Sequence, residues 1–205
     1  MNYSYKKTKY FNYKNLNNLK NKTLDFCNKF KKFYNKNSYI VSIDECGFNY
    51  NINPIYNWSK KGTNTYIKNK IITTTKRNIS ICASISIDGK LNYKLSYIPY
   101  NSNIFLEFLK SLQLPKNTII LMDNVPFHHS KIVNDYIEDN QYILLFTPPY
   151  SPWFNPIENI FSCIKNNFRK NKNIINSFNI DSNKIINTIN NTIFKILDNS
   201  YLNLV

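Results

Sequence analysis

A proline-rich turn that runs straight into an amphipathic helix is the feature that most constrains this fold. Residues 148–156 contain four prolines, and proline can neither donate to a strand ladder nor sit in a helix interior. Any strand before this segment must therefore end there. Asn155 suits a helix cap and Pro156 the first helical position, so we expect a helix to about Lys170. Glu158 then lies in its first turn, directly after a rigid loop.

Two stripes of side chains run along this expected helix. At about 100° per residue, the apolar positions share one stripe, namely Ile157, Ile160, Phe161, Ile164 and Phe168. Glu158 lies on a neighbouring stripe with Lys165 and Arg169. This placement suits a carboxylate that reaches a metal at the edge of a sheet, with cations further along to meet phosphates. Taken alone, Glu158 would be read as an acid that stabilises the positive end of the helix dipole.

Two further carboxylates stand at the ends of apolar runs upstream. Residues 39–43 and 118–122 read as strands, and they are followed by Asp44 and Asp123. Magnesium and manganese ions prefer oxygen ligands, and two ions about 3.5–4 Å apart can stabilise both the attacking and the leaving oxygen of phosphoryl transfer. The chain holds only 12 acidic residues, so a chance grouping is rarer than in an acidic protein. With Glu158, these residues suggest a divalent-metal site.

The first of these carboxylates is ambiguous, because Glu45 follows Asp44 directly. Successive side chains of a strand point to opposite faces, so only one of the two can enter a shared site. Spacing along the chain does not decide between them.

The charge of the chain favours a polyanionic partner. It has 27 Lys and Arg against 12 Asp and Glu, a net charge of +15, and nucleic acid is the first candidate. An anionic membrane surface would also fit this charge, but no apolar run is long enough to span a bilayer and no signal peptide is recognisable. We therefore expect a soluble, intracellular protein without a membrane partner. Four scattered cysteines and two histidines argue against a zinc module or a disulfide framework.

The N-terminal segment, residues 1–37, differs from the rest in composition. It holds ten lysines and one acid, Asp25, and its apolar residues between Leu16 and Phe33 hint at a helix. Two interpretations stay open: an arm that contacts DNA, or a solvated linker or leading helix. No helix-turn-helix is recognisable there, and the segment is too short for a paired-type DNA-binding domain. We expect one domain over residues 38–205.

The remaining pattern predicts a mixed α/β fold. Strands are expected at 78–87 and 91–98, joined by a tight turn at Asp88 and Gly89, after a short strand and turn at 56–62. Helices are expected at 102–112, 130–139 and from about 181 to 198, with a strand at 142–146. Antiparallel strands followed by alternating strands and helices indicate a mixed sheet covered by helices.

Several of these motifs together resemble a known family. They are residues 42–48 (Ser-Ile-Asp-Glu-Cys-Gly-Phe), then Trp58 and Gly62, residues 121–128 (Leu-Met-Asp-Asn-Val-Pro-Phe-His), and the run from Pro148 to Glu158. In this order, and with 34 residues between Asp123 and Glu158, they resemble the catalytic domain of DDE transposases of the mariner-like and related bacterial insertion-sequence superfamily. The resemblance extends from about Ser38 to Lys170.

The resemblance implies a set of functional residues. Asp44, rather than Glu45, would join Asp123 and Glu158 as the catalytic, metal-binding triad, with two Mg²⁺ or Mn²⁺ ions as cofactors. It implies a ribonuclease-H-like fold, a central mixed five-stranded sheet flanked by helices. It also suggests accessory roles for Asn124 and His128, although the residues alone favour His128 as a polar residue that organises its loop. Trp153 and Phe154 depart from the family, where an acidic or polar residue and a leucine are common.

The implied function is metal-dependent DNA strand cleavage and strand transfer. Double-stranded DNA, as transposon ends and target, would be the partner, bound by a homodimer or higher assembly. Lys165, Arg169 and Lys170 are candidate phosphate contacts, or else ordinary solvated charges. No base-reading module is visible here, so DNA recognition by a separate chain or by a missing N-terminal domain stays an open alternative. The expected location is with DNA, in a prokaryotic cytoplasm, a nucleus or a viral replication compartment.

Two alternatives remain at this point. One is a ribonuclease-H-like nuclease that cuts but does not join strands. The other is a truncated or repurposed transposase that acts as a DNA-binding module. All three acids of the triad are present, so the sequence shows no sign of catalytic decay.

Overall fold

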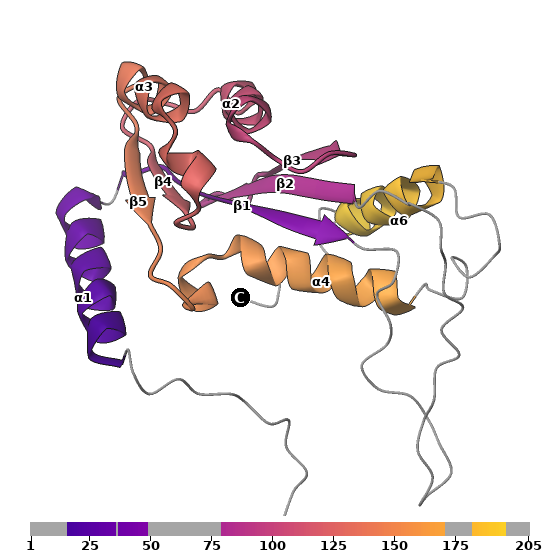
Figure 1. The fold of residues 1–205 in the computed structure, drawn as a ribbon, viewed down its shortest axis with the longest axis horizontal. Helices are drawn as coiled ribbons and strands as arrows, with labels where there is room; N and C mark the ends of the chain where they lie inside the picture. Colours follow the sequence, from indigo (N-terminus) through magenta and orange to yellow (C-terminus); the bar gives the residue numbers. More distant parts are fainter. Residues whose placement is uncertain (1–15, 36, 49–78, 171–181, 196–205) are drawn as a thin grey trace, which may run out of the picture.

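A computed structural model describes residues 16–35, 37–48, 79–170 and 182–195 (Figure 1). The strand and turn expected at 56–62, with Trp58 and Gly62, lie outside these residues. So do residues 1–15, the first part of the segment for which a DNA-contacting arm was one of two interpretations. In the described part of the chain, no helix is both long and apolar enough to cross a membrane.

A five-stranded sheet forms the centre of the molecule. Its strands are β1 (Ile40–Phe48), β2 (Ile79–Ser86), β3 (Leu91–Ser96), β4 (Ile119–Met122) and β5 (Ile143–Phe146). Across the sheet their order is β3-β2-β1-β4-β5. The pairs β1–β2 and β2–β3 are antiparallel, whereas β1–β4 and β4–β5 are parallel. The expected mixed five-stranded sheet is therefore confirmed.

The hairpin between β2 and β3 turns at the predicted residues. Gly89 has a φ of +81°, a left-handed conformation that glycine adopts without steric cost. Its N–H donates to the carbonyl of Ser86 at 2.8 Å. Asp88 accepts a hydrogen bond from the Tyr39 hydroxyl at 3.2 Å, so this acid is part of the turn.

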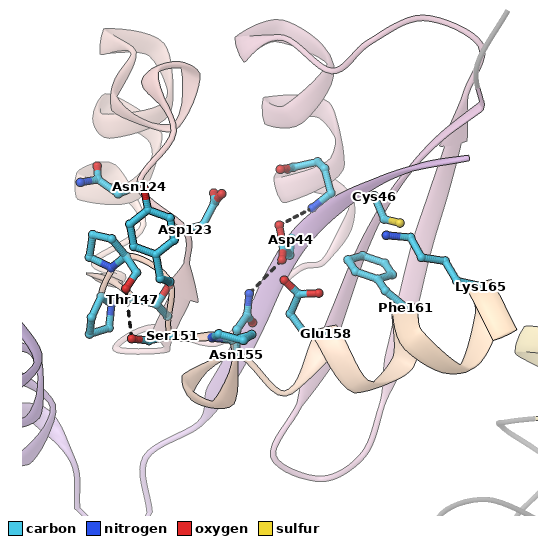
Figure 2. A pocket seen from close by; sticks show the side chains of 15 residues that line it. Asp44, Cys46, Asp123, Asn124, Thr147, Ser151, Asn155, Glu158, Phe161 and Lys165 are labelled. Carbon is cyan, nitrogen blue, oxygen red and sulfur yellow. Dashed lines mark hydrogen bonds between the residues drawn. The ribbon is translucent and has the colours of Figure 1, made fainter. Parts of the chain in front are cut away.

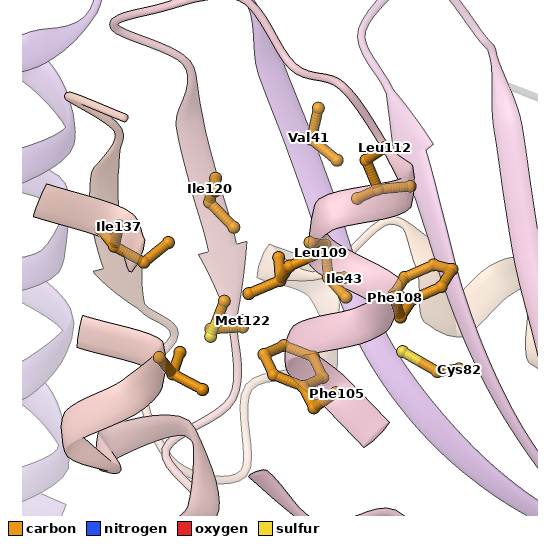
Figure 3. Close-up of a cluster of buried hydrophobic side chains, with 11 residues drawn as sticks. Val41, Ile43, Cys82, Phe105, Phe108, Leu109, Leu112, Ile120, Met122 and Ile137 are labelled. Atoms are coloured by element: carbon orange, nitrogen blue, oxygen red, sulfur yellow. The ribbon is translucent and has the colours of Figure 1, made fainter. Parts of the chain in front are cut away.

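Helices cover both faces of the sheet. On one face lie α2 (Ser102–Ser111) and α3 (Lys131–Asp139), and on the other α4 (Ile157–Lys170) and α6 (Ser182–Lys195) (Figure 1). The α2 side is packed with Phe105, Phe108 and Leu109 against Ile43 and Met122 (Figure 3). The α4 side buries Ile157, Phe161, Ile164, Ile189 and Ile193 against Phe48, Ile79 and Ile81. For α4, the buried Ile157, Phe161 and Ile164 belong to the stripe that helical periodicity predicted.

The N-terminal helix, α1 (Leu16–Phe33), packs beside β4 and β5 (Figure 1). Phe26 is only 7% exposed and belongs to one cluster with Ile119, Leu121 and Leu145. Its ring centroid lies 5.1 Å from that of Phe154, so α1 also contacts the proline-rich turn. The helix that the apolar residues hinted at is present. A boundary between an extension and a catalytic domain near residue 37 stays a prediction.

The first strand is longer than the sequence suggested. We expected it to end at Asp44, but β1 continues to Phe48 and pairs with β2 over Val41–Phe48. Cys46 and Phe48 are buried under α4, which is why the strand extends past its acidic residues. In contrast, β4 pairs with β1 only over Ile40–Ser42 and ends before Asp123, as expected.

The packing of α1 predicts that it contributes to global stability. Phe26→Ala should lower the free energy of unfolding by about 3 kcal/mol, because it removes a buried ring from a packed cluster. Leu24→Ala, on the same helix but 53% exposed, should change it by less than about 0.5 kcal/mol. Urea denaturation of both variants measures the difference. Equal, small effects would mean that α1 unfolds separately from the sheet.

Candidate active site

A pocket of about 480 Å³ opens where the parallel strands end (Figure 2). Residues of β1, of the segment after β4, of the proline-rich turn and of α4 line it. Among them are all three predicted carboxylates, Asp44, Asp123 and Glu158, together with Glu45, Asn124 and Lys165. The structure therefore brings the predicted acids into one cavity.

Strand register explains how Asp44 and Asp123 come together. The parallel pairing aligns Ile40 with Ile119 and Ser42 with Leu121. Continued by two residues, the same register places Asp44 level with Asp123. The carboxyl ends of parallel strands meet at one edge of a sheet, where ligands commonly bind. Glu158 arrives from the first turn of α4, where its N–H donates to the carbonyl of Asn155 at 3.1 Å.

The side chain of Asp44 is fixed on the α4 side of β1. Its Oδ1 accepts the N–H of Glu45 at 2.7 Å, and its Oδ2 accepts the side-chain amide of Asn155 at 3.1 Å. Asn155 is 4% exposed, and its Oδ1 accepts the hydroxyl of Ser42. We expected Asn155 only as a helix cap, whereas its side chain joins the start of α4 to β1. The sequence analysis did not predict this contact. Its only indication was Ser42, a polar residue two positions before Asp44 and therefore on the same face of the strand.

Burial and like charges make Asp44 hard to ionise. Burial chiefly raises the pKa of this carboxyl, the Glu45 N–H opposes that effect, and the carboxylates of Asp123, Glu158 and Glu45 add to it. The resulting pKa is about 7. Such a shift marks a group whose charge the fold alone does not compensate.

Asp123 lies just past the end of β4 and beside a buried histidine. His128 is 0% exposed, and its Nδ1 lies 3.0 Å from the Asp123 carbonyl and 3.2 Å from Asp123 Oδ1. The other ring nitrogen, Nε2, lies 3.3 Å from Glu45 Oε1. Burial alone would lower the pKa of His128, but the bonds to Asp123 and Glu45 outweigh it and raise that pKa to about 9.

The closest group of potential metal-ligand atoms differs from the predicted triad. In the described part of the chain, only Glu45, Asp123 and His128 form a group of three whose ligand atoms all lie within 4.8 Å of one another. Asp44 and Glu158 share the pocket with Asp123 without being so close. The assignment of Asp44, Asp123 and Glu158 as the catalytic triad thus stays a prediction.

The other predicted residues are only partly described. Asn124 lines the pocket and accepts a hydrogen bond from His129 Nε2. Lys165 also lines it, with its ammonium beside the Cys46 thiol (Figure 2). The side chains of Arg169 and Lys170 lie outside the described residues, and their role as phosphate contacts stays a prediction.

The two residues that depart from the family motif point in different directions. Phe154 packs toward α1 through Phe26, whereas Trp153 is 71% exposed. Tyr150, at the pocket wall, is 90% exposed and has a φ of +56°. This left-handed conformation is strained for a tyrosine, and such strain gathers at functional sites.

Comparison with known proteins identifies the family. A model of the DDE superfamily endonucleases matches residues 39–180, well over half of the chain. The chain belongs to this superfamily. A comparison with curated proteins found no match.

Solved structures show the same fold. A chain of the Mos1 strand transfer complex has a TM-score of 0.63 at 20% identity; the match covers 95% of this chain and 59% of that one. The Mos1 mariner transposase catalytic domain has a TM-score of 0.55 at 16% identity, covering 89% and 82%. A chain of the simian T-cell lymphotropic virus intasome has a TM-score of 0.52 at 14% identity, and the match covers 81% of this chain and 49% of that one. The ribonuclease-H-like fold is thereby confirmed. The chain spans about three-fifths of the first listed transposase chains.

The pocket suits hard divalent cations. Its acidic groups are carboxylates, the preferred ligands of Mg²⁺ and Mn²⁺. The Oδ1 atom of Asp123 is buried 3.2 Å from His128 Nδ1, but that nitrogen donates to the Asp123 carbonyl, so Oδ1 itself accepts no hydrogen bond. Burial and the neighbouring carboxylates raise the pKa of Asp44, and a cation bound beside it would favour its ionised form. The residues present therefore fit the metal ions that the family implies.

The buried carboxyl of Asp44 should destabilise the metal-free protein at high pH. Its pKa is about 7 in the fold against an ordinary 3.8, so its favourable contribution is complete below about pH 4 and is lost as the pH rises through 7. Asp44→Asn should remove this loss and stabilise the metal-free protein at pH 8 by up to about 4 kcal/mol.

Thermal unfolding in EDTA at pH 5 and pH 8 tests this expectation. The stabilisation by Asp44→Asn should grow between the two pH values. Asp135→Asn, an exposed acid on α3, serves as the control and should follow the wild type. An Asp44→Asn protein no more stable than wild type at pH 8 would show that the site compensates this charge without metal.

Proposed function

We propose that this chain is a transposase catalytic domain that cleaves DNA and transfers the cut strand, using divalent metal ions. One observation carries the proposal: carboxylates from β1, from the end of β4 and from α4 line a single pocket in a ribonuclease-H-like fold of the DDE superfamily. The net charge of +15 supports a nucleic-acid substrate.

Asp44, Asp123 and Glu158 are the residues that would hold the metal ions, two of them in our proposal. When bound, such ions supply activation of the attacking oxygen and stabilisation of the leaving oxygen. The chain itself orients the ligands. Asn155 and the Glu45 N–H fix both oxygens of Asp44, and the rigid turn before α4 sets the position of Glu158. Lys165, on the same pocket wall, would contact a phosphate.

The reaction has two steps at phosphorus. In cleavage, a water oxygen forms a bond to phosphorus while the bond to the 3′-oxygen breaks, leaving a 3′-hydroxyl and a 5′-phosphate. In strand transfer, this 3′-hydroxyl attacks a phosphodiester of target DNA and displaces another 3′-oxygen. Both steps develop negative charge on oxygens at the phosphate, so one pocket serves both.

The partners belong to the proposal as well. Similar solved structures include Mos1 strand transfer and paired-end complexes, and one paired-end complex contains Mg and another Mn. By analogy, this chain would act on transposon ends and target DNA as a homodimer or higher assembly. It would be located in the compartment that holds this DNA. In this proposal a separate chain or domain recognises the transposon ends.

A strand-transfer assay separates this function from its rivals. The chain is incubated with a labelled, pre-cleaved transposon-end duplex, a target plasmid and Mn²⁺. Joined product supports the transposase. Nicking without joining would favour a nuclease, and binding without either reaction would favour a DNA-binding module.

Removing one metal-binding carboxylate should abolish cleavage. Asp123→Asn and Glu158→Gln keep the side-chain shape but lose the anionic oxygen that binds a hard cation. The rate of plasmid nicking in Mg²⁺ should fall by more than the roughly 10–100-fold typical for loss of an outer-shell partner. Asp135→Asn is the matched control on the surface and should keep the wild-type rate. Full nicking by a folded Asp123→Asn protein would refute the proposed site.

Lys165 should contribute to DNA affinity without reading sequence. Lys165→Ala should weaken binding uniformly across sequences and reduce the slope of log affinity against log salt by about 1. Lys116→Ala is the control, because Lys116 is exposed and precedes β4, at the end of the strand away from Asp123. Fluorescence anisotropy at several salt concentrations measures both. Equal slopes for the two variants would show that Lys165 does not contact DNA.

A further inference from the structure

A second set of contacts supports the site from the opposite face of the sheet. Alternation along β1 turns Asp44 toward α4 and Glu45 toward α2 and η2 (Pro126–His129). On that face the imidazole of His128 bridges Glu45 and Asp123, at 3.3 Å from the carboxylate of the first and 3.0 Å from the carbonyl of the second. Glu45 Oε1 also accepts the thiol of Cys82 at 3.5 Å.

Packing fixes the His128 ring in this position. The ring is 0% exposed, and its centroid lies 4.4 Å from those of Phe105 and Phe127. Its backbone N–H donates to the Val125 carbonyl at 3.2 Å, which closes the short turn after β4. A ring held on all sides transmits its position to whatever it bonds.

The hydrogen bonds identify this ring as a bridge rather than a metal ligand. A carbonyl oxygen can only accept, so the Nδ1 atom that faces the Asp123 carbonyl must carry a hydrogen. That nitrogen has no lone pair to offer a metal. The Nε2 atom is directed at the Glu45 carboxylate, which leaves both ring nitrogens engaged with protein oxygens.

We propose that His128 and Glu45 are positioning residues, which together hold the Asp123 carboxylate where a metal ion can bind it. This inference rests on the proposed function, in which Asp123 is a ligand. Asp123 needs such support because β4 ends one residue before it and its Oδ1 has no hydrogen bond of its own. The Nδ1–H of His128, 3.2 Å from that Oδ1, limits where the carboxylate can turn.

Two substitutions of His128 separate the two ends of the bridge. An asparagine amide reaches about as far as Nδ1. His128→Asn therefore keeps a donor toward Asp123 and loses the contact with the Glu45 carboxylate. A glutamine amide reaches about as far as Nε2. His128→Gln therefore keeps the contact with the Glu45 carboxylate and loses the contact with Asp123. Outer-shell partners of this kind typically contribute 10–100-fold to metal affinity or activity.

Metal affinity is the decisive measurement. Mn²⁺ is titrated into metal-free protein without DNA, and free Mn²⁺ is followed by electron paramagnetic resonance. His128→Gln should raise the Kd for Mn²⁺ by about tenfold or more, and His128→Asn by less. The Mn²⁺ concentration for half-maximal nicking should rise in parallel, while saturating Mn²⁺ restores most of the rate because every ligand is still present.

Glu45 provides a second, independent pair of variants. Glu45→Ala should raise the Kd for Mn²⁺, and Glu45→Gln should raise it less, because a glutamine oxygen still accepts the Nε2 hydrogen. Val133→Ala is the control for stability alone, since Val133 is fully buried in the α2–α3 cluster and lies outside the bridge. It should lower the melting temperature and leave the Kd for Mn²⁺ unchanged.

Three outcomes would overturn the inference. One is a wild-type Kd for Mn²⁺ in folded His128→Gln, or in Glu45→Ala if His128→Gln does not fold. Another is the loss of one whole Mn²⁺ equivalent in His128→Gln with unchanged affinity for the rest, which would make His128 a ligand. The third is a Val133→Ala protein whose affinity for Mn²⁺ falls as much as that of His128→Gln. Failure of the proposed function is a separate result: wild-type protein that binds Mn²⁺ but cuts no DNA.

Discussion

The site depends on the point at which one pair of parallel strands stops. The strand β4 pairs with β1 only over Ile40–Ser42, whereas β1 runs on beside β2 to Phe48. Beyond Ser42 one edge of β1 has no strand partner among the residues that the structure describes, and the pocket occupies that side. Asp44 is the first α4-facing residue in this unpaired stretch. A longer β4 would fill the opening, and a shorter β1 would leave Asp44 without a rigid support.

Charge decides how the pocket must be completed. Four carboxylates line it, those of Asp44, Glu45, Asp123 and Glu158, and Lys165 is the one cation among the described lining residues. His128 lies between Glu45 and Asp123 on the far face. Within the described part of the chain, Asp44 is bonded only by neutral donors, the Glu45 N–H and the Asn155 amide. A protein of net charge +15 therefore keeps an anionic pocket, which is what a cation-dependent reaction on a polyanion requires.

Local patterns in the sequence were enough to predict most of the fold. Turn chemistry placed the hairpin at Gly89, and periodicity placed α2, which begins after a cap at Asn101 whose side chain accepts the N–H groups of Asn103 and Ile104. The end of β1 was wrong, because two adjacent acids and a glycine hide the alternation that buries Cys46 and Phe48. Burial there comes from α4, more than 100 residues away, which no local pattern encodes.

The sequence was enough to predict which acids gather in the pocket, but not what supports them. Strand ends and the helix start pointed to Asp123, Glu158 and the Asp44–Glu45 pair, family resemblance selected Asp44, and the assignment of these acids as metal ligands stays a prediction. The contacts of Asn155 with Asp44 and of His128 with Glu45 depend on tertiary register, across 111 and 83 residues of chain. Each residue has an adequate local explanation, one as a helix cap and the other as part of a turn. Only the assembled sheet shows that both reach β1.

The adjacency of Asp44 and Glu45 then has a physical meaning. They face opposite sides of one strand, yet both carboxylates line the pocket, so the expectation that only one of them could enter a shared site was wrong. Asp44 is bonded from the α4 side through Asn155, and Glu45 from the α2 side through His128. Any shift of β1 would disturb both contacts, so the two helical layers fix the strand between them. The carboxylates of Asp44 and Asp123 are thus held by neighbouring groups, Asn155 and His128, rather than by one another.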